Sequence, residues 1–115
     1  MVELELPYPP SVNTYWRHVG NKVLISKKGR IYRLEVASIV SQLGLKPISG
    51  PVRVSIAVYV PDKRRRDLDN ILKAFLDALA GPRGVYVDDS QIMELNIKKM
   101  SPVTGGRVIV RVWEI

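Results

Sequence analysis

Hydrophobic and polar residues alternate along several stretches of the chain, which is the pattern of a β-strand with one buried face. The clearest alternation runs from Val52 to Val60, where every second residue is valine or isoleucine. A shorter alternation of apolar and acidic residues covers Val2 to Leu6, and Lys22 to Ser26 fits a short strand. Leu95 to Met100 and Val108 to Val112 also fit strands, joined by a turn with two consecutive glycines. We therefore expect five strands along the chain.

Two other stretches place hydrophobic residues at every third or fourth position, as a helix with one apolar face does. The stronger pattern spans Leu68 to Leu79 and ends at a Gly-Pro pair. A second helix is expected from Ile31 to a stop at Gly44, with Leu34 among its apolar positions. The order of elements, β, loop, β, α, β, α, β, β, predicts an α+β fold. We expect a single two-layer domain over residues 1–115, with two main helices packed on one mixed sheet.

The composition of the chain excludes several classes of protein. Its 115 residues suit one globular domain, with 46% hydrophobic and 25% charged residues. The absence of cysteine excludes disulfides, thiolate zinc sites and cysteine nucleophiles, and the single histidine, His18, excludes paired-histidine metal motifs. No apolar run approaches the ~18 residues of a membrane helix, and the acidic start differs from the basic start of a signal peptide. We expect a cytoplasmic protein that does not enter a membrane.

The 18 lysines and arginines exceed the 11 acidic residues, which gives a formal net charge of +7. A small basic domain attracts polyanions, of which nucleic acid is the commonest. Solubility is the alternative explanation for this charge, but four consecutive basic residues, Lys63 to Arg66, repel one another. A second basic cluster contains Lys27, Lys28, Arg30 and Arg33. This placement favours phosphate binding.

The acidic residues are unevenly distributed along the chain. All six aspartates fall within one 28-residue window, and every glutamate lies outside it. Short carboxylates beside arginines would repel a phosphate unless a cation lay between them. At the predicted strand-to-helix junction, Asp67 fits the N-cap and Asp69 the first helical turn, where the helix dipole favours negative charge. In that structural interpretation, Lys73 is only the i, i+4 surface partner of Asp69. The six are Asp62, Asp67, Asp69, Asp77, Asp88 and Asp89.

The structural interpretation leaves three features unexplained. One carboxylate is enough to cap a helix, yet two are present, flanked by arginines that keep them ionised. Asn70, Lys73 and Asp77 continue a polar face along the helix, and Asp88 with Asp89 follows after a short return. Carboxylate oxygens without histidine or cysteine are hard ligands that suit Mg²⁺ or Mn²⁺. The alternative interpretation is therefore a site for metal-dependent phosphodiester hydrolysis.

Each residue type has a role in that chemistry. Lys73 would stabilise charge on the pentavalent phosphate or position the attacking water, as a point charge on a rigid helix. The arginines would hold flanking phosphates. Neighbouring residues of an extended chain point to opposite sides, so only one of Asp88 and Asp89 is expected to face the metal. The other is expected to cap the turn near Ser90.

Nearly the whole chain resembles the RusA family of Holliday-junction resolvases, small endonucleases that cut four-way DNA junctions. The most specific motifs are the central run Pro61-Asp62-Lys63-Arg64-Arg65-Arg66-Asp67-Leu68-Asp69-Asn70 and the paired aspartates of Val87-Asp88-Asp89-Ser90-Gln91. The proline-rich opening alone would be a weak signal. The other matching segments are residues 6–13, Tyr15-Trp16, Lys73, Asp77-Ala78-Leu79, Lys99-Met100 and Gly105-Gly106-Arg107.

The resemblance implies roles for individual residues. The family's catalytic carboxylates, which would also bind the metal, fall on Asp67, Asp69 and Asp89, and its catalytic lysine falls on Lys73. Also implied are Mg²⁺, with Mn²⁺ as an expected substitute, a homodimer, paired nicks that leave ligatable ends, and a phage or bacterial origin. A four-way junction has two-fold symmetry, so a two-fold dimer would present one site to each of two strands. The residues expected to contact DNA are Lys63, Arg64, Arg65, Arg66, Asn70, Asn13, Tyr15 and Trp16.

Several alternatives stay open. Tyr8, Tyr15 and Trp16 either stack on bases exposed at the crossover or pack beneath the proline-rich loop. One rival function is a non-catalytic basic nucleic-acid-binding module, in which the aspartates only cap helices and balance charge. Another is a different class of metal nuclease, since Pro61-Asp62 begins like a restriction-type motif, although the acid-x-lysine that should follow is missing. A third is a basic scaffold for protein assembly, against which a strong loss of affinity with salt would argue.

Overall fold

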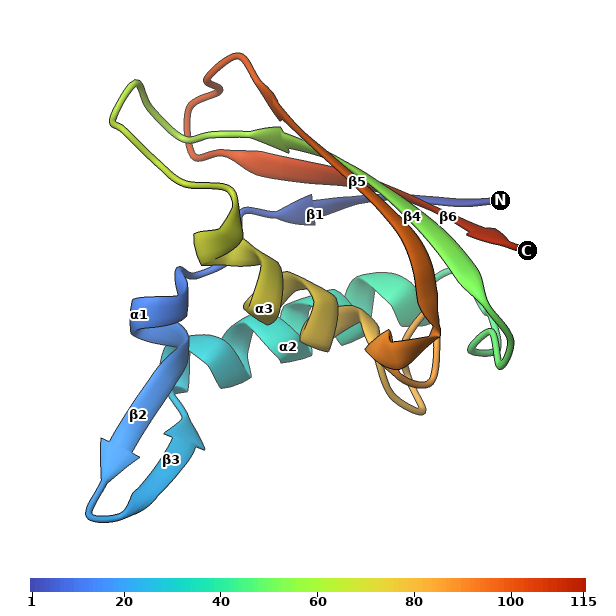
Figure 1. Cartoon of the computed structure of the whole chain (residues 1–115), viewed down its shortest axis with the longest axis horizontal. Helices are drawn as coiled ribbons and strands as arrows, with labels where there is room; N and C mark the ends of the chain where they lie inside the picture. Colours follow the sequence, from blue (N-terminus) through green and yellow to red (C-terminus); the bar gives the residue numbers. More distant parts are fainter.

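The computed structural model covers residues 1–115 and describes all of them. Four strands form one sheet in the order β1-β6-β4-β5 (Figure 1). They are β1 (Val2–Pro7), β4 (Val52–Tyr59), β5 (Ile92–Met100) and β6 (Arg107–Glu114). Strands β4 and β5 are parallel, whereas β6 is antiparallel to both β1 and β4. The mixed sheet predicted from the sequence is confirmed, and its parallel pair requires a crossover connection.

Two helices, α2 (Lys27–Ser41) and α3 (Asp69–Leu79), lie side by side on one face of this sheet (Figure 1). Helix α3 forms the crossover between β4 and the edge strand β5, which places it on one face of the sheet. The alternating valines and isoleucines of β4 and β6 are nearly fully buried, together with Phe75 and Leu79 of α3. Removing these apolar side chains from water is the main stabilising term of the fold. The expected two-layer α+β architecture with two main helices is confirmed.

Helix α2 begins earlier than the sequence predicts and buries a different face. It starts at Lys27 instead of Ile31, because the Ser26 side chain accepts a hydrogen bond from the Gly29 amide and caps the helix. Its buried positions include Tyr32, Val36 and Val40, whereas Leu34 is 68% exposed. The prediction of Leu34 as a core-facing position is therefore wrong, since the large hydrophobic residue lies on the solvent side.

The N-terminal part of the chain contains elements that the sequence did not predict. The proline-rich segment, expected as a loop, includes one helical turn, α1 (Val12–Tyr15). The residues that follow form β2 (Trp16–Val19), which also was not predicted. It pairs antiparallel with β3 (Lys22–Ile25), which confirms the short strand expected from Lys22 to Ser26. This β2–β3 hairpin is a separate two-stranded sheet that projects from the body of the molecule (Figure 1). None of the helices combines the length and apolar character needed to cross a membrane.

Candidate active site

The loop between β4 and α3 carries the consecutive basic residues and is held in place by Asp62. The Asp62 carboxylate accepts hydrogen bonds from the Arg64 amide at 2.9 Å and from the Arg66 guanidinium at 2.9 and 3.3 Å. The hydrogen bonds from Arg66 and then Arg64 hold the pKa of Asp62 below its ordinary value. The Lys99 ammonium on β5 donates to the Arg66 carbonyl oxygen from the other side of the loop. This part of the chain is therefore ordered before any DNA binds.

The structure separates the four basic residues of the loop into two kinds. Arg66, expected to bind DNA, is half-buried: its guanidinium is committed to Asp62 and lies 5.9 Å from the centre of the Tyr8 ring. Lys63, Arg64 and Arg65 are exposed. The Arg64 guanidinium keeps only a long 3.8 Å contact with Asp62. Arg66 thus serves to shape the loop, and the other three are available to phosphates.

A hollow of about 330 Å³ lies between this loop, the proline-rich segment and the first turn of α3. It brings together four of the residues that the sequence predicted for the site: Arg65, Arg66, Asp67 and Asn70. Basic, acidic and amide groups therefore share one concave surface, as phosphate and metal binding together would require. The other lining residues are Tyr8, Pro9, Ser11, Pro61 and Ile71.

Helix α3 begins at Asp69, and Asp67 does not cap it. The N-cap position is Leu68, with no side-chain hydrogen bond to the helix, and it is the Asp67 carbonyl that accepts from the Asn70 amide at 3.2 Å. The prediction of Asp67 as a side-chain N-cap is wrong. The consequence is functional, because a carboxylate that does not cap the helix is free to face the hollow.

A polar stripe continues along α3 beyond its first turn. Asp69, Lys73 and Asp77 are spaced four residues apart and so share one side of the helix. The Lys73 ammonium donates to Asp77 at 3.1 Å, so the expected pairing of Lys73 with Asp69 is not formed. The hydrogen bond to Asp77 raises the pKa of Lys73, and the charges of Asp77 and Asp89 add to that rise. The charge of Asp89, which is distant in sequence, is thus among those that raise the pKa of Lys73.

Asp88 and Asp89 have different environments, as predicted from their adjacency. The Asp88 carboxylate accepts a hydrogen bond from the Ser90 amide at 2.9 Å and caps a 3-10 turn at Asp89–Gln91. The hydrogen bonds from Ser90 lower the pKa of Asp88. The Gln91 side chain accepts from the Asp88 amide at 2.8 Å and donates to the carbonyls of Ile48 and Gly50. Capping by Asp88 is confirmed, and this network fixes the turn on which Asp89 stands.

The six aspartates consequently divide into two sets of three. Three of them accept hydrogen bonds within the fold. Asp62 accepts from Arg64 and Arg66, Asp77 accepts from Lys73, and Asp88 accepts from Ser90. The side chains of Asp67, Asp69 and Asp89 make no hydrogen bond and no ion pair. A carboxylate left without a partner beside basic groups is suited to recruiting a cation or a ligand.

The three free carboxylates fit a hard divalent cation in their chemistry. They are oxygen donors without nitrogen or sulfur, the type of ligand that Mg²⁺ and Mn²⁺ prefer. They do not form a closed cage, because no three acidic, histidine or cysteine side chains lie close enough to surround an ion. Asp67 and Asp69 stand at the start of α3, whereas Asp89 stands on the separate 3-10 turn before β5. Mg²⁺ commonly keeps several waters and uses substrate phosphate oxygens, so a partial set of carboxylates suits it.

The aromatic residues of the N-terminal segment differ in their exposure. Tyr15 is fully buried, so the prediction that it stacks on DNA bases is wrong. Its ring packs edge-on against Trp16, with ring centres 4.9 Å apart, and its hydroxyl makes no hydrogen bond. Trp16 is half-buried, as is Tyr8 in the wall of the hollow, and Asn13 is exposed on α1. Of the four residues of this segment that the sequence proposed for contact with DNA, Tyr8, Asn13 and Trp16 keep accessible surface and Tyr15 does not.

The sequence did not predict how two residues, Tyr8 and Lys99, shape the site through Arg66. Tyr8 supports the Arg66 guanidinium, and Lys99 anchors the loop through the Arg66 carbonyl. Both residues occur in segments that resemble the RusA family, and this resemblance was an indication in the sequence that they matter. Their partners lie far away in the sequence, and only the folded chain pairs them.

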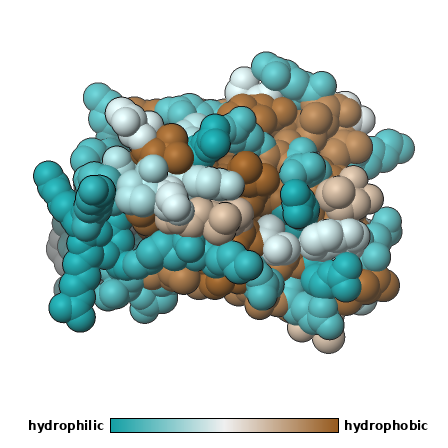
Figure 2. All heavy atoms as spheres, turned by 90° about the horizontal axis from the view of Figure 1, so that it is seen from above, coloured by the Kyte–Doolittle hydropathy of each residue, from teal (hydrophilic) through white to brown (hydrophobic).

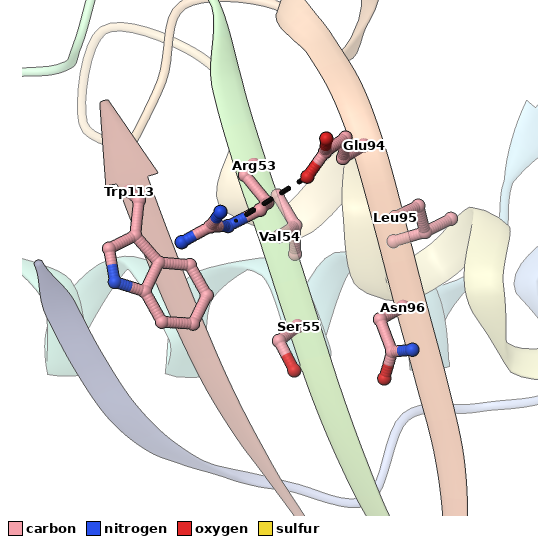
Figure 3. A pocket seen from close by; sticks show the side chains of 7 residues that line it. All are labelled: Arg53, Val54, Ser55, Glu94, Leu95, Asn96 and Trp113. Atoms are coloured by element: carbon pink, nitrogen blue, oxygen red, sulfur yellow. Dashed lines mark ion pairs between the residues drawn. The ribbon is translucent and has the colours of Figure 1, made fainter. Parts of the chain in front are cut away.

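The largest hollow of the molecule lies elsewhere, on the open face of the sheet opposite the helices. Seen from above, this face mixes hydrophobic and hydrophilic side chains (Figure 2). The hollow measures about 520 Å³ and includes Arg53 between Trp113 and Glu94 (Figure 3). The Arg53 guanidinium lies 4.5 Å from the Trp113 ring centre and 3.9 Å from the Glu94 carboxylate. No residue predicted for the site lines it, so size alone does not mark the active site here.

Known proteins resemble this chain over nearly its whole length. The sequence profile described as Endodeoxyribonuclease RusA matches residues 7–113, which is nearly the whole chain. The chain belongs to the RusA family. Among its RusA relatives, the crossover junction endodeoxyribonuclease of Enterobacteria phage HK97 is 44% identical over 111 residues, covering 96% of this chain and 92% of the relative. The proteins of the same name from Escherichia coli K12 and Enterobacteria phage 82 are 39% and 40% identical, each over 97% of this chain and 93% of the relative.

Proposed function

We propose that this RusA chain is a metal-dependent endodeoxyribonuclease that resolves four-way DNA junctions by paired, symmetric nicks. The observation that carries the proposal is the division of the aspartates. Asp67, Asp69 and Asp89 lack partners within the fold, and they stand at the positions that resemble the family's catalytic carboxylates. The names of the RusA relatives, crossover junction endodeoxyribonucleases, supply the substrate class.

The three free carboxylates would hold Mg²⁺, or Mn²⁺ in its place. The bound cation would supply Lewis acidity at a phosphoryl oxygen and a more acidic water. The protein contributes the placement of the carboxylates: two at the start of α3 and one on the capped turn before β5. Because no cage is closed in advance, phosphate oxygens and waters would complete the coordination when DNA is bound.

Lys73 would act as a fixed positive charge and not as a base. Its pKa is raised by the hydrogen bond to Asp77, so the ammonium stays protonated throughout the neutral range. Asp77 also fixes its direction on α3. A cation held at this position would stabilise the charge that builds up on the phosphate during cleavage.

The basic loop would hold the phosphates around the cleavage position. Lys63, Arg64 and Arg65 are exposed beside the hollow that contains Asp67 and Asn70. Guanidinium groups bind phosphates through paired hydrogen bonds, which fixes the strand as well as attracting it. Asn70 would add an amide donor on the same surface.

A homodimer follows from the symmetry of the substrate. Paired nicks in a two-fold junction need two sites, which a two-fold dimer provides. We propose such a dimer, acting on bacterial or phage DNA in the cytoplasm, since the relatives come from phages and enterobacteria. A mass in solution of twice that of the chain would support the dimer, and a monomer at the concentrations of cleavage would contradict it.

The test is a cleavage assay with a labelled four-way junction, a fork and a plain duplex of shared sequence, in Mg²⁺ or EDTA. We expect cuts at paired positions of the junction in Mg²⁺, with the duplex intact and no cutting in EDTA. Tight junction binding without cutting would contradict the proposal and favour a non-catalytic basic binding module.

A further inference from the structure

The β2–β3 hairpin has no role in the site described so far, yet it lies in the most basic segment of the chain and itself carries Arg17 and Lys22 without an acidic residue. Between Glu5 and Glu35 there is no acidic residue, while six lysines and arginines occur. This segment, which includes the hairpin and the start of α2, therefore has a formal charge of +6 out of +7 for the whole chain. We propose that the β2–β3 hairpin binds DNA and contacts the duplex next to the cleavage position. We call this hairpin the DNA-binding arm.

The root of the hairpin is held firmly, which gives the arm a defined direction. The Ser26 amide donates to the Tyr15 carbonyl at 2.8 Å, and the Ser26 hydroxyl donates to the Thr14 carbonyl. Gly29 on α2 closes the same junction. A Cβ atom there would lie 2.7 Å from the Ile25 side chain and 2.9 Å from the Tyr15 carbonyl oxygen. Only glycine allows α2 to approach the hairpin this closely.

The outer part of the hairpin is exposed and has no partner within the chain. An isolated two-stranded hairpin is at best marginally stable in water, so such an element usually acts with a partner. Arg17 and Lys22 lie on one face, because Arg17 is opposite Leu24 and Lys22 is opposite Val19 in the register. Leu24 and Val19 on that face are 42% and 45% exposed, and Val23 on the other face is 55% exposed.

The hairpin begins beside the candidate active site. Tyr15, the residue before β2, is buried where α1 packs against α2 and α3. Burial raises the pKa of its hydroxyl, and the charges of Asp77, Arg33 and Lys73 also act on it. From that root, β2 extends over three residue steps, about 10 Å at the usual rise of a strand. DNA bound at Lys73 would therefore continue past the hairpin.

The chemistry of the arm selects DNA over a second copy of the chain. Basic side chains without a nearby acid fit a phosphate backbone, and a two-stranded ribbon has the width to enter a DNA groove. Exposed apolar side chains between the charges can contact sugars and bases there. Two such hairpins facing each other across a two-fold axis would bring like charges together. This proposal depends on the proposed function only in taking four-way junctions as the DNA that the arm binds.

The test measures junction binding without cleavage, in EDTA, over a series of salt concentrations by fluorescence anisotropy. The arm variant is the full-length chain with Arg17→Gln and Lys22→Gln. The control variant carries Lys46→Gln and Lys98→Gln, at two exposed lysines away from the arm. Both variants lose two charges and should fold normally, because all four side chains are exposed. We expect weaker binding and a slope of log K against log salt smaller by about 1.8 in the arm variant alone, at about 0.9 per phosphate contact.

Equal affinity and slope in the arm variant and the wild type would overturn the proposal, as would equal losses in the arm and control variants. A change in the solution mass of the arm variant with unchanged DNA binding would also overturn it, by making the hairpin a contact between copies. The outcomes separate from those of the proposed function. A wild type that binds through the arm but never cuts would contradict the nuclease and leave the arm supported.

Discussion

At the scale of single residues, what distinguishes the aspartates is whether the fold already uses them. Asp62, Asp77 and Asp88 order a loop, a lysine and a turn, whereas Asp67, Asp69 and Asp89 are left free. Sequence reasoning identified the same three through resemblance, and it separated Asp88 from Asp89 by the geometry of adjacent residues. Its structural interpretation paired Lys73 with Asp69, whereas the partner is Asp77; both aspartates are four positions away, so spacing alone does not decide between them.

Charge removal at Asp69 separates binding from catalysis. Without metal, the free carboxylates repel the phosphates that the basic loop attracts. Asp69→Asn should therefore bind a four-way junction in EDTA at least as tightly as the wild type, as measured by anisotropy. Glu94→Gln on the open sheet face is the control and should bind as the wild type does. Binding ten times weaker in Asp69→Asn would make that carboxylate a structural support.

Lys73 tests the role of a fixed charge. Lys73→Met should fold but lose at least ~100-fold in cutting rate, the typical effect of removing one group that stabilises transition-state charge. Lys73→Arg should recover part of the rate because it keeps the charge. The hydrogen bond to Asp77 raises the pKa of Lys73, so the lysine should stay protonated between pH 6 and 9. The cutting rates of the wild type and of Lys73→Arg should therefore depend on pH in the same way over this range. Retained cutting in Lys73→Met would reduce the lysine to a surface partner of Asp77.

At the scale of elements, burial decides what the sequence reveals. Strand β4 and helix α3 were predicted because each buries one face. Burial of one face requires hydrophobic residues at every second position of a strand and about every 3.6 positions of a helix. Of the β2–β3 hairpin, β3 was predicted but β2 was missed, because the hairpin packs on no core and β2 shows no alternation. The start of α2 was missed because Lys27 and Lys28 are exposed and polar. The loop geometry at Arg66 depends on Tyr8 and Lys99, which no local pattern connects to it.

Helix α3 should be sensitive to loss of packing beneath it. Phe75 is 1% exposed and packs in the core between α3 and the sheet. Phe75→Ala should lower the free energy of unfolding by about 3–5 kcal/mol, through lost transfer and an unfilled cavity. Domains of this kind are stable by only about 5–15 kcal/mol, so urea unfolding should shift markedly. Leu34→Ala, on the exposed side of α2, is the control, and an equal loss there would contradict the described core.

The basic loop should depend on pH through Asp62. Its pKa is lowered by the hydrogen bonds from Arg66 and Arg64, so its contribution to stability is present above its unfolded pKa of about 3.9. That contribution is lost as the pH falls through the lower folded pKa. Asp62→Asn should therefore melt at a lower temperature than the wild type at pH 6, and the difference should close towards pH 2. A difference that persisted unchanged at pH 2 would show that the ion pair does not stabilise the loop.

At the scale of the whole molecule, one small fold separates its tasks in space. The sheet and two helices form the core, the start of α3 and the turn before β5 carry the free carboxylates, and the hairpin and basic loop carry charge that would attract DNA. The net charge of +7 would itself predict binding to polyanions of any kind. The carboxylates set within that charge are what turn a binding surface into a candidate for hydrolysis.

The most direct measurement compares four single variants in the Mg²⁺-dependent junction cleavage assay, each checked for folding by circular dichroism. Asp69→Asn and Asp89→Asn remove free carboxylates, while Asp62→Asn and Asp88→Asn remove carboxylates that already have partners in the fold. We expect the first two to lose cutting by more than ~100-fold, and the second two to keep most of it at neutral pH. Cutting that survived in Asp69→Asn or Asp89→Asn, or that fell equally in all four folded variants, would contradict the assignment of the site.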